Sequence, residues 1–72
     1  MNVAERRDWM KSLDTGMYSG ENVDGDPVIV LRTVGSGCVI KTKHSSKPKW
    51  WECISYDEEG DLKEFYYEPA EE

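Results

Sequence analysis

The chain has 72 residues and a net charge of −6, with 38% hydrophobic and 33% charged residues. A chain this short forms one domain that buries only about 60% of its unfolded surface, so a large dry cavity holding an active site is excluded. Its eight aromatic residues supply material for a core and argue against a disordered chain.

Residues 2–14 are predicted to form an N-terminal helix. Asn2 is a good N-cap, and Glu5 stands three residues later, where a capping box needs an acid. Trp9, Met10 and Leu13 fall on one side of this helix, so we expect that side to pack on a sheet. Residues 15–27 are rich in Gly, Asp and Asn and are predicted to be a loop, with room for a short strand at 17–19.

Residues 28–68 are predicted to form a four-stranded meander with strands at 28–33, 37–43, 49–56 and 62–68, followed by an acidic tail at 69–72. Gly35-Ser36 fits a two-residue turn, the second loop is centred between Ser45 and Ser46 if it is symmetric, and Glu58-Glu59-Gly60 fits a three-residue turn. These turns place one set of side chains on a single core face: Ile29, Leu31, Cys38, Ile40, Trp51, Cys53, Phe65 and Tyr67.

The predicted fold is therefore α+β, with the N-terminal helix covering a four-stranded antiparallel sheet. A small SH3-like barrel is the alternative, because the same strands can curl and partly bury both faces. The opposite face of the sheet would carry Trp50, Tyr56 and Tyr66 beside Arg32 and Lys41. Trp, Tyr and Arg are the residue types that dominate protein interfaces, so these five residues are the predicted protein-binding set.

The residues that carry chemistry are few. Cys38 and Cys53 are the only thiols and His44 is the only imidazole. In the predicted register His44 lies at a hairpin tip, too far from either thiol to act as its base, and one His with two Cys does not complete a zinc site. We therefore expect no enzyme activity, cofactor, metal or small-molecule substrate, although Cys38 and Cys53 would face each other closely enough for a disulfide.

Charge is unevenly distributed along the chain. Residues 28–51 hold five basic side chains and no acid, whereas residues 52–72 hold nine acids and one lysine. A basic hairpin with adjacent aromatics can bind single-stranded nucleic acid through phosphate contacts and base stacking. The residues predicted for that alternative are Lys41, Lys43, Lys47, Lys49 and Trp50.

The N-terminus lacks the apolar core of a signal peptide, and the longest apolar run, Val28–Leu31, is far shorter than a membrane span. The sequence therefore predicts a cytoplasmic protein with reduced thiols and no membrane partner. Its expected function is that of a small accessory or inhibitory factor that binds another protein through the exposed sheet face. A C-terminal acidic strip would assist: Asp57, Glu58, Glu59, Asp61, Glu64, Glu68, Glu71 and Glu72.

Overall fold

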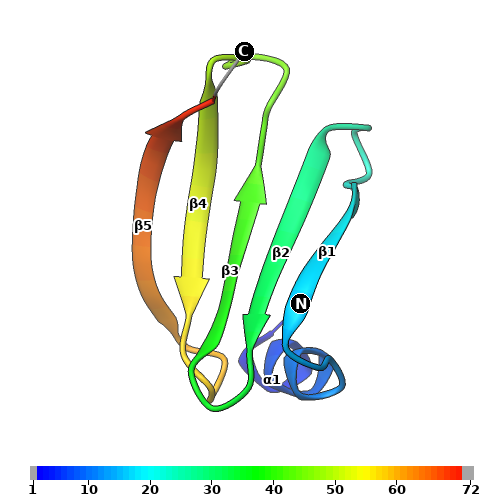
Figure 1. Ribbon diagram of the computed structural model, residues 1–72, viewed down its shortest axis with the longest axis vertical. Helices are drawn as coiled ribbons and strands as arrows, with labels where there is room; N and C mark the ends of the chain where they lie inside the picture. Colours follow the sequence, from blue (N-terminus) through cyan, green and yellow to red (C-terminus); the bar gives the residue numbers. More distant parts are fainter. Residues whose placement is uncertain (1, 71–72) are drawn as a thin grey trace.

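The computed structural model describes residues 2–70 and contains a short helix and an antiparallel sheet (Figure 1). The elements are α1 Val3–Lys11, β1 Gly16–Glu21, β2 Pro27–Thr33, β3 Gly37–Thr42, β4 Trp50–Tyr56 and β5 Leu62–Pro69. The strands lie side by side in chain order, with β1 and β5 at the edges. The α+β class is confirmed. The sheet has five strands rather than four and is open, so the SH3-like barrel is not confirmed.

The helix begins as predicted and ends earlier than predicted. The Asn2 side chain accepts a hydrogen bond from the Glu5 backbone N–H, and the Glu5 carboxylate accepts one from the Asn2 N–H, which completes a capping box. The last helical residue is Lys11, after which the backbone N–H of Ser12 and that of Leu13 close a final turn. Met10 is fully buried, so the predicted apolar side of α1 does face the sheet.

The predicted loop at 15–27 is mostly a hairpin, and the short strand allowed at 17–19 is part of β1. Asn22 accepts hydrogen bonds at its side-chain oxygen from the N–H groups of Asp24 and Asp26, and Gly25 has a φ of 82°. The same arrangement closes β4 and β5, where the Asp57 side chain accepts from Glu59 and Asp61. The two turns share a sequence pattern, NVDGD at 22–26 and DEEGD at 57–61, and this repeat was the signal for the extra strand.

The predicted pairing of the strands is wrong in all three hairpins of the meander. Between β2 and β3 the loop has three residues, not two, and Leu31 lies opposite Val39 rather than Ile40. Between β3 and β4 the loop is not symmetric about Ser45 and Ser46, and Ile40 lies opposite Ile54 rather than Trp51. The predicted turn at residues 58–60 is confirmed, with Gly60 at a φ of 88°, but a bulge next to it shifts the rest of β5 by one residue.

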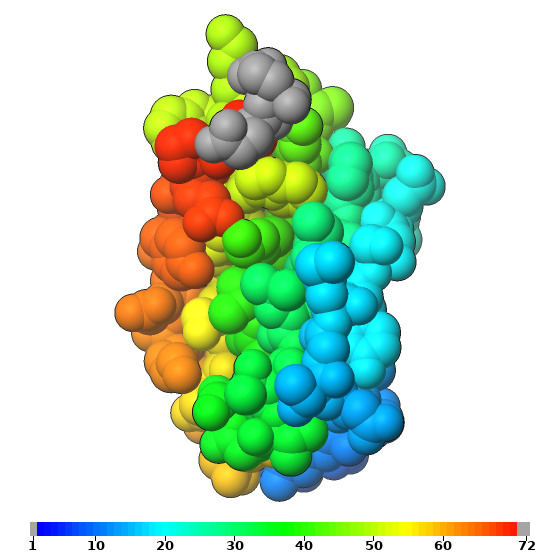
Figure 2. All heavy atoms as spheres, viewed as in Figure 1, coloured from blue at the N-terminus to red at the C-terminus, as the bar shows by residue number. Residues whose placement is uncertain are grey.

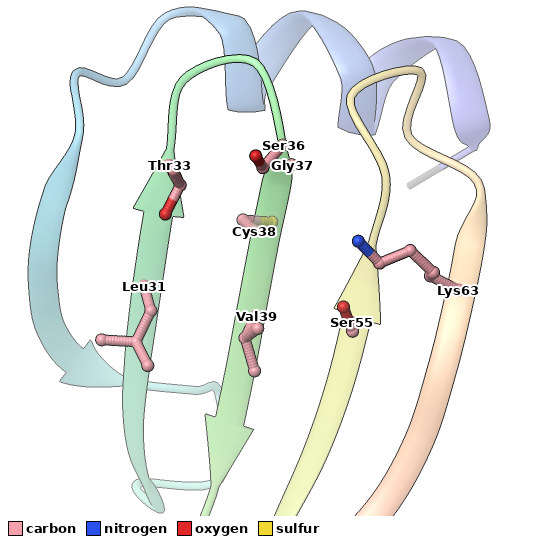
Figure 3. Close-up of a pocket in the computed structure, with 8 residues that line it drawn as sticks. All are labelled: Leu31, Thr33, Ser36, Gly37, Cys38, Val39, Ser55 and Lys63. Carbon is pink, nitrogen blue, oxygen red and sulfur yellow. The ribbon is translucent and has the colours of Figure 1, made fainter.

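Each shift is an odd number of residues, so each one exchanges the two faces of a strand. The predicted core face is therefore divided between two faces. The helix face, on which α1 lies, carries Val28, Val30, Arg32, Cys38, Ile40, Ile54, Tyr56, Phe65 and Tyr67. The far face carries Ile29, Leu31, Val39, Lys41, Trp51, Cys53, Ser55 and Tyr66. A hollow on the far face is bordered by Leu31, Val39, Ser55 and Lys63 (Figure 3).

A buried ion pair joins the end of β2 to the β4–β5 turn. The Arg32 guanidinium donates to both carboxylate oxygens of Glu58, at 2.8 and 3.0 Å. Arg32 also donates to the carbonyl oxygens of Leu13, Thr33 and Gly37. Glu58 in turn accepts from the N–H groups of Gly35 and Gly37. This network connects the end of α1, the β2–β3 loop and the β4–β5 turn, and it satisfies a guanidinium whose side chain is only 1% exposed.

Gly37 is predicted to be the most sensitive glycine in the β2–β3 hairpin. It has a φ of 104°, and a Cβ built there would lie 1.9 Å from the Tyr56 carbonyl oxygen. Gly35 also has a positive φ, 92°, but a Cβ there would meet nothing within 4 Å. We expect Gly35→Ala to cost about 1–2 kcal/mol of unfolding free energy and Gly37→Ala to cost at least about 3 kcal/mol or prevent folding. Urea unfolding measures the unfolding free energy of each variant. Equal losses for the two variants would contradict the close approach of Tyr56 in β4 to Gly37.

Stability should depend on the ionisation of Glu58. The hydrogen bonds from Arg32 lower the pKa of Glu58 from its usual 4.5 to about 2. The stabilisation is therefore complete above pH 4.5 and is lost as the pH falls towards 2. We expect Glu58→Gln to lower the Tm by at least about 10 °C at pH 7, and this difference to shrink towards pH 2. Glu59→Gln, one residue along, is the control and should melt like the wild type. If the difference in Tm between Glu58→Gln and the wild type stays constant with pH, the stabilisation does not come from the ionised Glu58 carboxylate.

Candidate interaction surface

The five residues of the predicted protein-binding set do not share one surface. Arg32 is buried in its pair with Glu58, and Tyr56 is half-buried beneath Arg6, whose guanidinium carbon lies 4.2 Å from the ring centroid. Lys41 lies on the far face and forms an ion pair with Glu68. Trp50 and Tyr66 are both exposed, but they lie on opposite faces of the sheet. The prediction of a single contact face is therefore wrong in its geometry.

The predicted basic hairpin is present as a loop with lysines beside aromatic rings. Lys43 places its ammonium 5.8 Å from the centroid of the Trp51 ring, and Lys47 places its own 5.0 Å from the centroid of Tyr67. Such contacts are attractive because the face of an aromatic ring is electron-rich. Lys49 is exposed next to Trp50. Lys41 does not belong to this group, since it pairs with Glu68 on the far face.

Three large aromatic side chains stand together on the helix face, at the β4–β5 margin. Trp50, Phe65 and Tyr67 are 46%, 53% and 44% exposed, and we call them the aromatic surface. Phe65 and Tyr67 meet edge to face with their centroids 5.6 Å apart, and Tyr67 and Trp50 border a common hollow with Lys47. Figure 2 shows β5, in orange to red, forming one margin of the molecule. The exposure of these rings shows that α1 does not cover them.

The sequence pattern contained a signal for one exposed ring of β5, Tyr66 on the far face, but not for the aromatic surface itself. Phe65, Tyr66 and Tyr67 are consecutive in one strand. Side chains alternate between the faces of a strand, so three consecutive aromatics must place at least one ring on each face. Only one face of a sheet is covered by a single short helix, and an aromatic on the other face is therefore exposed. Phe65 and Tyr67 lie on the helix face, where the sequence placed them in the core, but both are exposed because α1 does not cover them.

Within residues 2–70, the two ends of the β4–β5 hairpin carry opposite charge. Lys47 and Lys49 lie in the loop before β4, and the acids Asp57, Glu59 and Asp61 lie in the turn before β5. The predicted acidic strip is only partly available, because Glu58 is bound to Arg32 and Glu68 to Lys41. Its last members, Glu71 and Glu72, lie outside the described residues.

The two cysteines do not face each other. Cys38 lies opposite Tyr56 on the helix face, and Cys53 lies opposite Lys41 and Tyr66 on the far face, so the predicted Cys38–Cys53 contact is wrong. Both are free thiols, and burial raises the pKa of each. A raised pKa keeps a thiol protonated at neutral pH, which makes it a poor nucleophile.

His44 lies between two carboxylates rather than near a thiol. Its Nε2 is 3.1 Å from Glu52 and its Nδ1 is 3.5 Å from Asp26. The two carboxylates meet different ring nitrogens, so they do not converge on one metal position. Across residues 2–70, no group of three or more His, Cys, Asp or Glu side chains is placed to hold a metal ion. The arrangement instead joins the β1–β2 turn to the β3–β4 loop and to β4.

No family model matches the chain, and comparison with curated proteins and with solved structures finds no significant similarity. In the described range, no helix is long and apolar enough to cross a membrane. The site must therefore be interpreted from its own geometry.

We predict that His44 titrates above the usual 6.5 of a histidine. The hydrogen bond to Glu52, and then the one to Asp26, raise its pKa. Because the folded pKa is the higher one, the ion pairs stabilise the fold fully below pH 6.5, and this contribution is lost as the pH rises through the folded pKa. NMR titration of the ring protons measures that value directly. Glu52→Gln should move it back towards 6.5, whereas Glu21→Gln on β1 should leave it unchanged. A wild-type His44 pKa that is not raised above 6.5 would contradict the pairing of His44 with Glu52 and Asp26.

Proposed function

We propose that this protein is a non-enzymatic accessory or inhibitory factor that binds another protein through the aromatic surface of Trp50, Phe65 and Tyr67. The supporting observation is the exposure of three large aromatic rings, about half of each, side by side on one face. Isolated exposed apolar residues are ordinary in proteins, but a contiguous group of them usually marks a contact site.

The composition of the surface also fits a protein partner. Trp and Tyr are enriched among residues that dominate binding energy, because they bury a large area at little entropic cost. Lys47 beside Tyr67 and the acids of the β4–β5 turn would form a polar rim around the rings. Only Met10, Cys38 and Cys53 are buried apolar side chains in the described chain, so much apolar area is left for a partner to cover.

Single-stranded nucleic acid is the second candidate ligand. The observation in its favour is the position of Lys47 and Lys49 next to Tyr67 and Trp50, which would join phosphate contacts to rings on which bases stack. The net charge of −6 and the acids at the other end of the same hairpin oppose a long polyanion. We therefore rank a protein partner first.

Capture experiments with matched variants test the proposal. Trp50→Ala and Tyr67→Ala should each weaken binding of a captured partner by at least about 30-fold, the loss typical of an interface hot spot. Tyr66→Ala removes an equally exposed aromatic ring from the far face and should retain the partner. Equal binding by all three variants would reject the aromatic surface.

Titration with mixed-sequence single-stranded DNA and RNA at low and near-physiological salt distinguishes the second candidate. Binding that weakens steeply with salt, with a slope reduced by about 0.7 for each of Lys47→Ala and Lys49→Ala, would favour nucleic acid. No amide shifts at low salt would exclude it.

A further inference from the structure

β5 ends the sheet with an unpaired edge. It is the last strand in the sheet order, and all of its residues except Lys63 at the bulge pair with β4 and with no other strand. The Ala70 N–H donates to the Lys49 carbonyl at 2.9 Å. Hydrogen-bonded positions alternate along antiparallel strands, so the backbone groups of Phe65 and Tyr67 point away from β4. These outward groups are available to a further strand.

The middle of the β5 edge, at Phe65 to Tyr67, carries none of the devices that normally prevent pairing. Edge strands are usually protected by prolines, by lysines or by being short. β5 is eight residues long, its proline is its last residue, and its single lysine, Lys63, lies near the bulge. The other edge, β1, has six residues and includes Gly16 and Gly20, which weaken strand pairing. β5 is therefore the edge better suited to accept another strand.

The charges along this margin favour an antiparallel copy of the same chain. The acidic turn precedes β5. At the far end of β5 the Ala70 N–H donates to Lys49 of the basic loop, and Glu71 and Glu72 follow Ala70 in the sequence. A parallel copy would place the two acidic turns together, and like charges in contact disfavour such an arrangement. A second β5 running antiparallel separates the two acidic turns and brings each one to the end of the other copy that holds Lys47 and Lys49.

The faces and charges of β5 also limit which residues of the two β5 strands can lie opposite each other. A two-fold axis between antiparallel strands is perpendicular to the sheet, so residues that pair must share a face. With the axis beside Phe65, Glu64 lies opposite Tyr66 of the other copy, and Phe65 lies opposite Phe65. Moving the axis to Tyr66 would instead place Glu64 opposite Glu68, two like charges in direct contact.

We infer that two copies of this chain pair through β5 in antiparallel orientation about a two-fold axis beside Phe65, forming one continuous sheet. Both helix faces lie on the same side of this sheet, so the two aromatic surfaces adjoin. The inference goes beyond the proposed function, because it depends on the backbone edge of β5 and on charge rather than on the aromatic side chains. A single strand buries less area than the roughly 1,200–2,000 Å² of a standard interface, so we expect association in the micromolar range.

Amide hydrogen exchange of the wild-type protein at increasing concentration tests the pairing. The amides of Phe65 and Tyr67 should exchange at least about tenfold more slowly at millimolar than at low micromolar protein concentration. The outward amides of Met17 and Ser19 on β1, identified by the same alternation from the Asn22 to Asp26 hydrogen bond, are the internal control and should not change. Sedimentation over the same range should show a monomer–dimer equilibrium.

A pair of charge variants tests the orientation. Glu59 and Asp24 occupy the same position in the DEEGD and NVDGD turns, and both are exposed. Glu59→Lys would bring a lysine to the basic loop of the other copy and should weaken dimerisation at least tenfold at low salt. Asp24→Lys makes the same change of charge away from β5 and should leave the dimer unchanged.

The outcomes separate this inference from the proposed function. A protein that stays monomeric at millimolar concentration would overturn the inference, as would a dimer in which the β1 amides rather than those of Phe65 and Tyr67 become protected. A dimer equally insensitive to Glu59→Lys and Asp24→Lys would overturn the antiparallel orientation. Trp50→Ala should lose the captured partner while keeping the dimer, so either proposal can fail while the other holds.

Discussion

The ion pair between Arg32 and Glu58 is the interaction on which the rest of this small fold depends. The guanidinium is almost fully buried and is satisfied by a carboxylate and by backbone carbonyls from three separate segments. An unpaired buried charge is too costly for a domain of this size to tolerate. The β4–β5 turn must therefore stay against the β2–β3 hairpin, and the end of α1 must stay beside both. Two charged residues thus connect parts of the chain that few apolar contacts hold together.

That dependence follows from how little apolar material is buried. Met10, Cys38 and Cys53 are the buried apolar side chains of residues 2–70, and two of them are small. The helix has nine residues and lies near one end of the sheet (Figure 1), so it covers only part of one face. The larger aromatics of β4 and β5 are left at the surface, where they contribute less to folding and are available for binding. The short chain limits the buried core. The polar connecting network and the exposed aromatic margin both follow from that small core.

The aromatic surface and the β5 edge belong to the same hairpin but offer different chemistry. The rings present apolar area on one face of the sheet, and the edge presents unpaired backbone groups in its plane. Among the residues that the structure describes, opposite charges lie at the two ends of the hairpin. A contact on the face and a contact at the edge do not obstruct each other, so one short hairpin has room for two kinds of association.

Several elements could be predicted from residues alone because their causes are local. The capping box of Asn2 and Glu5, and the three-residue turn that ends in Gly60, depend on neighbours within a few positions. The β1–β2 hairpin was equally local, since NVDGD repeats the pattern of DEEGD, but it was predicted as a loop. Phe65 and Tyr67 were assigned to the helix-covered face, on which both do lie, but the nine-residue α1 leaves their rings exposed.

The sequence by itself determined the α+β class, the amphipathic helix, the last turn and the separation of charge along the chain. Only the tertiary structure decided which residues face each other. Glu58 accepts from the N–H groups of Gly35 and Gly37, and Arg32 donates to the carbonyl oxygens on both sides of that loop. These contacts come from residues distant in sequence, and they favour a three-residue loop over the two-residue turn that local pattern allows. Because side chains alternate along a strand, that single extra loop residue exchanges the faces of the paired strands, so Ile29 and Leu31 lie on the far face while Cys38 and Ile40 lie on the helix face.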